Sequence, residues 1–317
     1  FDFLFRRKVM KRLCLFAGFS PKQKIEQYVV YYLKSLSETV DVYYCADNDL
    51  SAEETAKIAP FVKGVFLGKH SKYDFGSWAK IIDAVGWDFI ERYDEMILTN
   101  DSCFGPICPL QPIFDKMDAL DCDAWGLAKN KFLMSFFLVV KKRMFLRDDF
   151  RAFFKELKPS ADKTYFVQCE KRLSGILCSG KTAAFLDKKD LKSLYKQHRR
   201  EIKSALRQVI PFPLRLIMRI RTNKIRLYDN EALILPFLGF PFIKKNAFYM
   251  FNSVVPMFGL TFIQRFTDYD PRLISAVTEQ YCTEQPSVSK YIRLRLNAAL
   301  DQNRRHRLKS RQSVSKP

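Results

Sequence analysis

Hydrophobic and polar positions follow two alternating patterns in the first half of the chain. Short apolar runs that end in turn residues predict buried strands, and they cover residues 11–16, 39–46, 64–67 and 96–99. Helix signals lie between them: Ser20-Pro21 opening a helix to about residue 36, a Ser51-x-x-Glu54 capping box, and a stretch after Asp74 that runs to Val85. Strands that alternate with helices predict a largely parallel sheet covered on both faces.

The later segments extend this pattern and then depart from it. Residues 109–117 are helical in pattern, 132–140 form an apolar run typical of a central strand, and the phenylalanines of 145–157 have the spacing of a core-facing helix. From Lys188 a basic helical stretch begins and runs to residue 207. Residues 214–221 mix large apolar side chains with arginines. This segment is compatible with a helix in a membrane interface, and equally with a soluble helix whose arginines are solvated.

Composition limits the class of protein. The 317 residues, with 48% hydrophobic and 15% aromatic content, support a packed core in one large domain or two small ones and exclude a disordered chain. The eight cysteines have no paired spacing, which indicates neither a disulfide framework nor a zinc site and suits a reducing cytosol. There is no run of about 18 uncharged apolar residues and no signal peptide, although the chain lacks an initiator Met.

The net charge of +20 is concentrated in the second part of the chain. Residues 1–187 contain 28 basic and 25 acidic side chains, whereas residues 188–317 contain 26 basic and 9 acidic ones. A field of that strength attracts nucleic acid or an anionic membrane face. We therefore predict an enzyme-like domain at 1–187, a basic helical region for acceptor or membrane at 188–301, and a disordered basic tail at 302–317.

The most informative local pattern lies at the end of the apolar run 96–99. Asn100, Asp101 and Ser102 follow it directly, and the chain then breaks at Gly105-Pro106. In open α/β sheets, ligands bind outside the carboxyl ends of the strands, where a carboxylate can hold Mg²⁺ or Mn²⁺ against substrate phosphates. A sugar bound to a nucleotide diphosphate is a substrate of that kind. An Asx-turn, in which Asp101 bonds its own backbone, explains the same residues equally well.

Six motifs in a fixed order add a resemblance to a known family. They are Tyr-Asp-Phe-Gly-Ser-Trp at 73–78, Leu-Thr-Asn-Asp-Ser-Cys-Phe-Gly-Pro at 98–106, Asp-Ala-Trp-Gly-Leu at 123–127, Ser-Phe-Phe-Leu-Val at 135–139, Glu-Lys-Arg-Leu-Ser at 170–174 followed by Gly180, and Gly-Phe-Pro-Phe-Ile-Lys at 239–244. Over roughly residues 10–250 this set resembles the rhamnan synthesis protein F family of bacterial polysaccharide and lipopolysaccharide biosynthesis.

The resemblance implies a fold and an activity. It implies an α/β, Rossmann-like A-type glycosyltransferase domain with a mostly parallel central sheet, followed by the basic, mainly helical region. The implied reaction is inverting transfer of a deoxyhexose, commonly L-rhamnose from dTDP-rhamnose, to a lipid-linked glycan. The implied location is cytoplasmic, peripheral on the inner face of the cytoplasmic membrane, with an anionic membrane surface and no nucleic acid as a partner.

The resemblance also suggests catalytic residues. Glu170 is the candidate general base for the acceptor hydroxyl, since the motif around it resembles the acidic motif that opens a helix beside the acceptor. An ordinary glutamate at a helix N-terminus is the alternative. Asp123 is a candidate to face the acceptor, with Trp125 beside it as an aromatic wall or as plain core.

The remaining candidates concern the donor. Asp101 is the metal and diphosphate candidate, with Asn100 or Ser102 completing the shell. Asp74 would contact the base or ribose, or cap a helix. His70 lies near this site or is structural, and Lys244 would meet a phosphate or lie in solvent.

The chain departs from the family pattern at two places. His70 and Lys72 stand where the family has Asn and Gly, and Phe132 and Met134 stand where it has His and Gln. The loss of two polar side chains at 132 and 134 favours a second hypothesis, a non-catalytic scaffold of a glycan-assembly complex. The basic second part supports a third, a nucleic-acid-binding protein, although no nucleic-acid module is recognisable.

Overall fold

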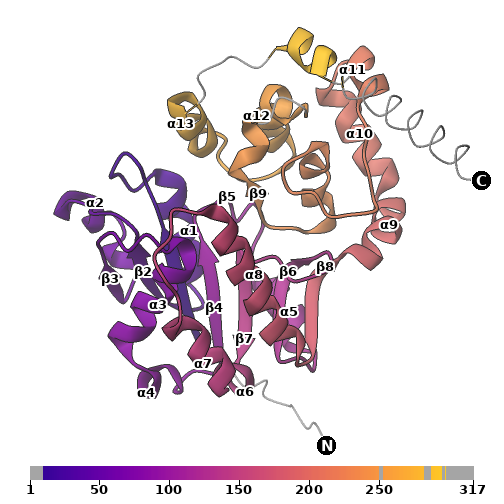
Figure 1. The fold of residues 1–317 in the computed structure, drawn as a ribbon. Coiled ribbons are helices and arrows are strands. Elements are labelled where there is room, and N and C mark those ends of the chain that lie inside the picture. Colours follow the sequence, from indigo (N-terminus) through magenta and orange to yellow (C-terminus); the bar gives the residue numbers. More distant parts are fainter. Residues whose placement is uncertain (1–9, 250–252, 282–286, 295–296, 298–317) are drawn as a thin grey trace, which may run out of the picture. The chain divides into compact units, whose positions relative to one another are not determined.

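The computed structural model describes residues 10–249, 253–281, 287–294 and 297, and the chain divides into two compact units (Figure 1). The first unit is Phe1–Leu191 and the second is Lys192–Pro317. The first is a mixed α/β unit and the second is mainly helical. The functions assigned to the two parts from sequence stay predictions, and the tail at 302–317 lies outside the described residues.

A seven-stranded sheet forms the centre of the first unit. Its strands are β1 (Arg12–Gly18), β2 (Asp41–Ala46), β3 (Gly64–Phe66), β4 (Glu95–Asn100), β6 (Ala124–Lys129), β7 (Phe137–Lys141) and β8 (Thr182–Asp187). Their order in the sheet is β3-β2-β1-β4-β7-β6-β8. Every neighbouring pair is parallel except the two pairs that involve β7. The predicted α/β class with a mostly parallel sheet is therefore confirmed.

The direction in which the sheet is built reverses between β1 and β4. From β1 the chain proceeds to β2 and β3 on one side, and it then returns to place β4 on the other side of β1. The register pairs Phe16 with Thr99, so the carboxyl ends of both strands finish at one edge of the sheet. We call it the carboxyl edge, and the edge at the amino ends of β1 and β4 the amino edge. Such a reversal leaves a crevice outside the strand ends, which is where open α/β sheets bind ligands.

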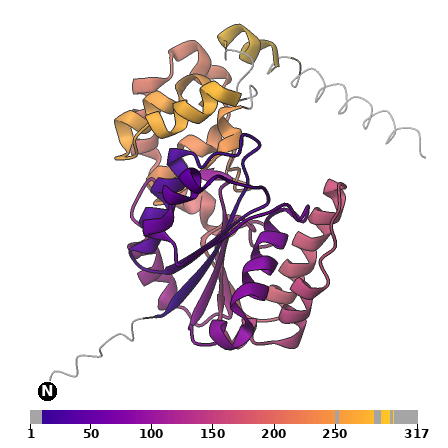
Figure 2. The same ribbon diagram turned by 90° about the vertical axis from the view of Figure 1, so that its left-hand side faces the viewer.

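Helices cover both faces of the sheet (Figure 2). On one face, α3 (Tyr73–Val85), α7 (Asp148–Lys155) and α8 (Lys163–Cys178) share a buried apolar cluster with alternate residues of β1 and β4. On the other face lie α1 (Gln27–Ser37) and α5 (Gln111–Asp118). There the Phe16 and Tyr32 rings meet at 5.2 Å. The alternation arises because successive side chains of a strand point to opposite faces. Short elements complete the unit: α2 (Ala52–Ala56), α4 (Trp87–Ile90), α6 (Lys142–Phe145), the 3₁₀ turn Ala59–Phe61 and β5 (Cys103–Phe104).

The second unit packs helices around an irregular segment. Its helical elements are α10 (Arg199–Val209), α11 (Phe212–Ile217), α12 (Val255–Phe266) and α13 (Arg272–Tyr281), and α9 (Lys188–Gln197) leads into it. The segment between α11 and α12 holds three 3₁₀ turns, Asn230–Leu233, Leu235–Leu238 and Lys245–Phe248, and β9 (Ile243–Lys244). Buried Asn230 fixes this segment, since its Oδ1 accepts from the Val254 N–H at 2.9 Å and its Nδ2 donates to the Arg219 carbonyl at 3.2 Å. None of the helices in the described parts of either unit is long and apolar enough to cross a membrane.

Several predicted elements differ from the observed ones for local reasons. The first helix begins at Gln27 rather than at residue 20, because Gln23 has a left-handed φ of 53° that a helix cannot contain. The apolar run 132–140 is a strand only from Phe137. The run 214–221 is helical only to Ile217, because Met218 has an extended backbone with ψ of 128°. Beyond it, the Arg221 N–H donates to the Glu231 carboxylate at 2.6 Å.

Candidate functional site

Asp101 joins the carboxyl ends of β1 and β4. Its N–H donates to the Ala17 carbonyl at 3.1 Å, and its Oδ2 accepts from the Phe19 N–H at 3.2 Å. The Tyr28 hydroxyl donates to the Asp101 carbonyl at 2.9 Å. Because Asp101 is half-buried and fixed from both strands, its carboxylate is held at the rim of the sheet rather than in the core.

The rim beside Asp101 is closely packed. The Tyr44 side chain lies against Gly18, and a Cβ at Gly18 would collide with the phenol ring, so only glycine fits there. Burial raises the pKa of Tyr44, and the nearby charge of Asp101 raises it further. Tyr44 is therefore a neutral phenol beside the Asp101 carboxylate.

Asn100 links Ser102, which follows Asp101, to Asp74 of helix α3. Its Nδ2 donates to Asp74 Oδ2 at 2.6 Å, and its Oδ1 accepts from the Ser102 N–H at 3.1 Å and from the Ser102 hydroxyl. Asp74 lies in the first turn of α3. Only 4% of Asn100 is exposed, so its amide positions Asp74 and Ser102. The expectation that Asn100 or Ser102 completes a metal shell, directly or through water, stays a prediction.

The loop before α3 is strained and is held by Asp47. Asp47 Oδ1 accepts from the N–H groups of His70 and Ser71 at 2.6 and 3.0 Å. Ser71 and Tyr73 have left-handed φ angles of 56° and 51°. Two such residues within three positions, neither a glycine, cost energy that the surrounding bonds must offset. This strain is at the carboxyl edge, next to Asp74.

His70 fixes the same loop from inside. Its Nδ1 accepts from the Lys72 N–H at 3.2 Å, and its Nε2 lies 3.0 Å from the Ser77 hydroxyl. Burial lowers the pKa of His70, against the charge of Asp47, which raises it. A Cβ at Gly76 would collide with the His70 ring and with Lys72, so the glycine of the Tyr-Asp-Phe-Gly motif is required by this packing. Of the two interpretations of His70, the contacts support the structural one.

Glu170 shares this edge of the sheet through Ser135. The Ser135 hydroxyl donates to Glu170 Oε1 at 2.6 Å. Ser135 lies just before β7, which runs antiparallel to β4 and pairs Phe137 with Thr99, and the Thr99 hydroxyl donates to the Phe136 carbonyl at 2.9 Å. Glu170 is in the middle of α8, so both expectations that placed it at a helix N-terminus are wrong.

Asp123 lies at the opposite edge. It directly precedes β6. Ala124 of β6 pairs with Val140 of β7, and Val140 pairs with Met96 near the amino end of β4. Asp123 therefore lies at the amino edge. Its Oδ2 accepts from the Lys181 N–H at 2.6 Å, and its Oδ1 pairs with Arg143. The structure therefore does not bring Asp123 together with Asp101 and Glu170, and its expected role toward the acceptor stays a prediction. Trp125 is fully buried against Phe114, so it belongs to the core and forms no wall of the site.

The side-chain oxygens at the carboxyl edge supply only part of a coordination shell for a hard divalent cation. Carboxylate and hydroxyl oxygens from Asp101, Asp74 and Ser102 gather at this edge, and such cations prefer oxygen ligands. Among the described residues, no three His, Cys, Asp or Glu side chains converge as a metal cluster. A cation here would need oxygens from a substrate diphosphate, which is how Mg²⁺ is commonly held. Lys244 lies in β9 of the second unit, and its role stays a prediction.

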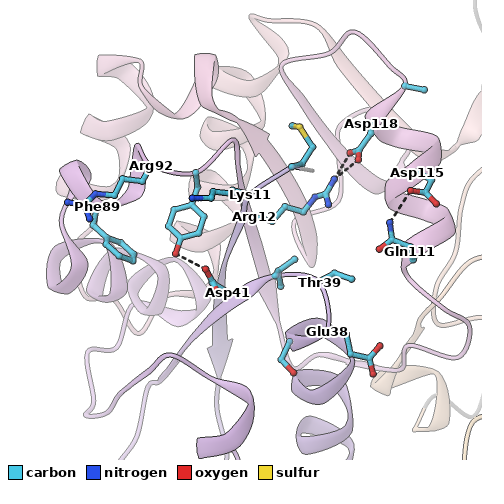
Figure 3. Close-up of a pocket in the computed structure, with 15 residues that line it drawn as sticks. Lys11, Arg12, Glu38, Thr39, Asp41, Phe89, Arg92, Gln111, Asp115 and Asp118 are labelled. Carbon is cyan, nitrogen blue, oxygen red and sulfur yellow. Dashed lines mark hydrogen bonds and ion pairs between the residues drawn. The ribbon is translucent and has the colours of Figure 1, made fainter. Parts of the chain in front are cut away.

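A cavity of about 860 Å³ lies at the amino edge, away from these residues (Figure 3). Arg12, Asp41 and Asp118 line it. Arg12 bonds Glu95 at 2.7 Å and both oxygens of Asp118 at 2.6 Å, and the Tyr93 hydroxyl donates to Asp41 at 2.9 Å. Charged residues of its lining, such as Arg12 and Asp118, are paired with one another, whereas topology, strain and the clustering of carboxylates favour the carboxyl edge as the candidate site.

Sequence reasoning missed three residues of the site. Asp47 follows the buried strand β2 in an Asp-Asn-Asp run, the same pattern that identified Asn100-Asp101-Ser102, so it could have been found in the same way. Ser135 was part of a motif, but its partner Glu170 is 35 residues away. Tyr28 binds Asp101 from α1, and no local pattern indicates that contact.

Most residues of the carboxyl edge lie in a segment of the chain that matches a known protein family. Residues 42–174 match the family described as Rhamnan synthesis protein F, which confirms the predicted resemblance over that range. The matched segment contains Asp47, Asp74, Asp101, Ser135 and Glu170. A search of curated protein sequences found no match.

Solved structures of glycosyltransferases are similar at low identity. A candidate nucleotide-diphospho-sugar transferase from Desulfovibrio desulfuricans G20 is 15% identical, with a TM-score of 0.33, over 60% of this chain and 88% of that one. The glycosyltransferase GlyE of Streptococcus pneumoniae TIGR4 is 14% identical, with a TM-score of 0.37, over 65% and 53%. Core-mannan synthase A of Aspergillus fumigatus, in its Mn/GDP form, is 8% identical, with a TM-score of 0.29, over 54% and 66%.

Proposed function

We propose that this protein is a glycosyltransferase that moves a sugar, L-rhamnose or another deoxyhexose, from a nucleotide diphosphate to a lipid-linked glycan. One observation carries the proposal: the segment that matches the rhamnan synthesis family brings Asp74, Asp101 and Glu170 to the same edge of the sheet. That edge is the carboxyl edge at the strand-order reversal, where this class of sheet binds nucleotides.

The proposed donor site is built around Asp101. Its carboxylate would hold Mg²⁺ or Mn²⁺ together with the donor diphosphate, and such a cation would stabilise the negative charge on the departing nucleotide. Asp74, held by Asn100 at 2.6 Å, binds the ribose or base. The strained loop at 70–73 keeps the first turn of α3 directed at the donor.

Glu170 is the proposed general base. A carboxylate near the acceptor hydroxyl takes its proton as the hydroxyl oxygen attacks the anomeric carbon. The bond from that carbon to the nucleotide diphosphate breaks on the opposite face, so the configuration is inverted and the nucleotide diphosphate leaves. The Ser135 hydroxyl, 2.6 Å from Glu170 Oε1, fixes the orientation of the carboxylate. Ser135 thus acts through Glu170 as a positioning residue.

The proposed location is the inner face of the cytoplasmic membrane, because the acceptor is lipid-linked and residues 188–317 contain 26 basic but only 9 acidic side chains. The protein would bind there peripherally. Polysaccharide or lipopolysaccharide assembly is the process in which such an acceptor is extended.

A donor screen tests this function. Thermal unfolding of the full chain is measured with dTDP-rhamnose and with UDP-, GDP- and other dTDP-sugars, each with and without Mn²⁺, since a bound ligand stabilises the folded state. We expect one nucleotide class to raise the melting temperature, more strongly with Mn²⁺, and the same donor to support transfer. A chain that binds no nucleotide sugar under any condition would instead be the scaffold suggested by Phe132 and Met134.

A further inference from the structure

The second unit exposes an apolar pair on helix α11 (Phe212–Ile217). Leu214 is only 2% exposed and points into the unit, whereas Phe212 is 63% and Leu216 is 69% exposed. Residues four positions apart lie on the same face of a helix, so these two side chains form one apolar point on the surface. They are more exposed than any other large apolar side chain among the described residues.

Only basic charges surround this pair in the sequence. Residues 207–228 contain six Arg or Lys side chains and no Asp or Glu. Arg207 on α10, together with Arg219, Arg221 and Lys224 after α11, is exposed. The Arg215 guanidinium lies 5.7 Å from the centre of the Phe212 ring, which keeps a cation beside the apolar point.

We propose that Phe212 and Leu216 insert into the interface of an anionic phospholipid bilayer while Arg219, Arg221 and their basic neighbours bind lipid phosphates. The free energy falls when an apolar side chain leaves water for the boundary between headgroups and acyl chains. The negative surface of the membrane also attracts the nearby cations. A nucleic acid would attract the cations but offers no comparable environment for Leu216. This surface would provide the membrane contact for the location proposed above, and it rests on that proposed function.

Vesicle co-sedimentation tests the proposal. The full chain is mixed with phosphatidylcholine vesicles, with and without phosphatidylglycerol, at low and high NaCl, and no sugar donor or acceptor is added. Binding is therefore judged independently of glycosyl transfer, and either proposal can fail alone. We expect binding only to the vesicles with phosphatidylglycerol, weakened by salt.

Two double variants separate the apolar and the charged contributions. Phe212→Ser/Leu216→Ser is expected to weaken vesicle binding at least about tenfold. Arg219→Gln/Arg221→Gln is expected to weaken it roughly fivefold for each cation removed. Leu120→Ser, a partly exposed leucine of the first unit, and Lys155→Gln/Lys158→Gln, exposed lysines of the first unit, are the matched controls and should bind as wild type.

Three outcomes would overturn the proposal. The first is wild-type vesicle binding by the serine double variant with an unchanged melting temperature. The second is tight binding of duplex DNA that the glutamine variant loses and the serine variant keeps, which would assign the surface to nucleic acid. The third is no vesicle binding together with a dimer that the serine variant dissociates, which would assign it to a second copy of the chain.

Discussion

The two edges of the central sheet both collect charged side chains, but they do so differently. At the amino edge, Arg12 is 6% exposed and pairs with fully buried Glu95 and with Asp118 beside a cavity of about 860 Å³. At the carboxyl edge, Asp47 and Asp101 accept backbone N–H groups and Asn100 holds Asp74. At the amino edge, opposite charges neutralise one another within the fold. At the carboxyl edge, the carboxylates are held by backbone N–H groups and an amide beside a strained loop, an arrangement found at many ligand sites. We therefore base the proposed site on topology and on the kind of pairing at each edge, and the following experiments test that choice.

The largest effect on activity is expected from Glu170→Gln. The amide cannot accept the acceptor proton, so kcat should fall roughly 10²–10⁴-fold while donor affinity is unchanged. Turnover and donor binding are measured on the same preparation. Glu156→Gln is the control and should keep wild-type turnover, because Glu156 is exposed just after α7 and pairs only with Arg172 among the ion pairs of the described residues. Wild-type kcat in the Glu170 variant would remove Glu170 from the mechanism.

Asp101→Ala tests the donor side of the same edge. Loss of the carboxylate should lower kcat/KM roughly 10³-fold and abolish the Mn²⁺-dependent part of donor binding. Asp115→Ala, at the amino edge, removes a carboxylate that bonds only Gln111 among the hydrogen bonds resolved here and should leave transfer unchanged. If Asp115→Ala impaired transfer and Asp101→Ala did not, the assignment of the two edges would be reversed.

Arg12→Met makes the complementary test at the amino edge. It leaves the buried Glu95 without its cation, and burial already raises the pKa of Glu95. We expect the free energy of unfolding to fall by about 3 kcal/mol or more, with kcat per folded molecule unchanged. Urea unfolding and initial rates at a temperature where the variant is folded measure both. A loss of kcat without a loss of stability would give this edge a catalytic role.

Much of the first unit follows from the sequence because its signals are local. The run 96–99 and the polar residues after it identified β4 and Asp101, and alternating patterns identified the sheet. The partners of those residues are distant in sequence: Asn100 meets Asp74 and Ser135 meets Glu170 only because the chain crosses the sheet between them. Asp123 precedes the apolar run of β6, but its motif does not give the direction of β6 in the sheet, which depends on pairing with β7 and β8.

The smallest effect concerns His70. Because burial lowers its pKa in the folded state, the unfolded chain binds more protons near and below pH 6.5, and stability falls as the pH is lowered through that range. His70→Gln should flatten this acid loss of stability, and His198→Gln, in the second unit, should not. Asp47, Lys72 and Lys80 face the ring and are kept in both variants. Equal acid slopes in wild type and His70→Gln would contradict the burial argument.

A crystal structure of the full chain with dTDP and Mn²⁺ tests the central claim most directly. The account predicts a diphosphate and a metal ion beside Asp101, at the carboxyl ends of β1 and β4, with the nucleoside near Asp74. Nucleotide bound instead in the cavity lined by Arg12 and Asp118 would contradict it.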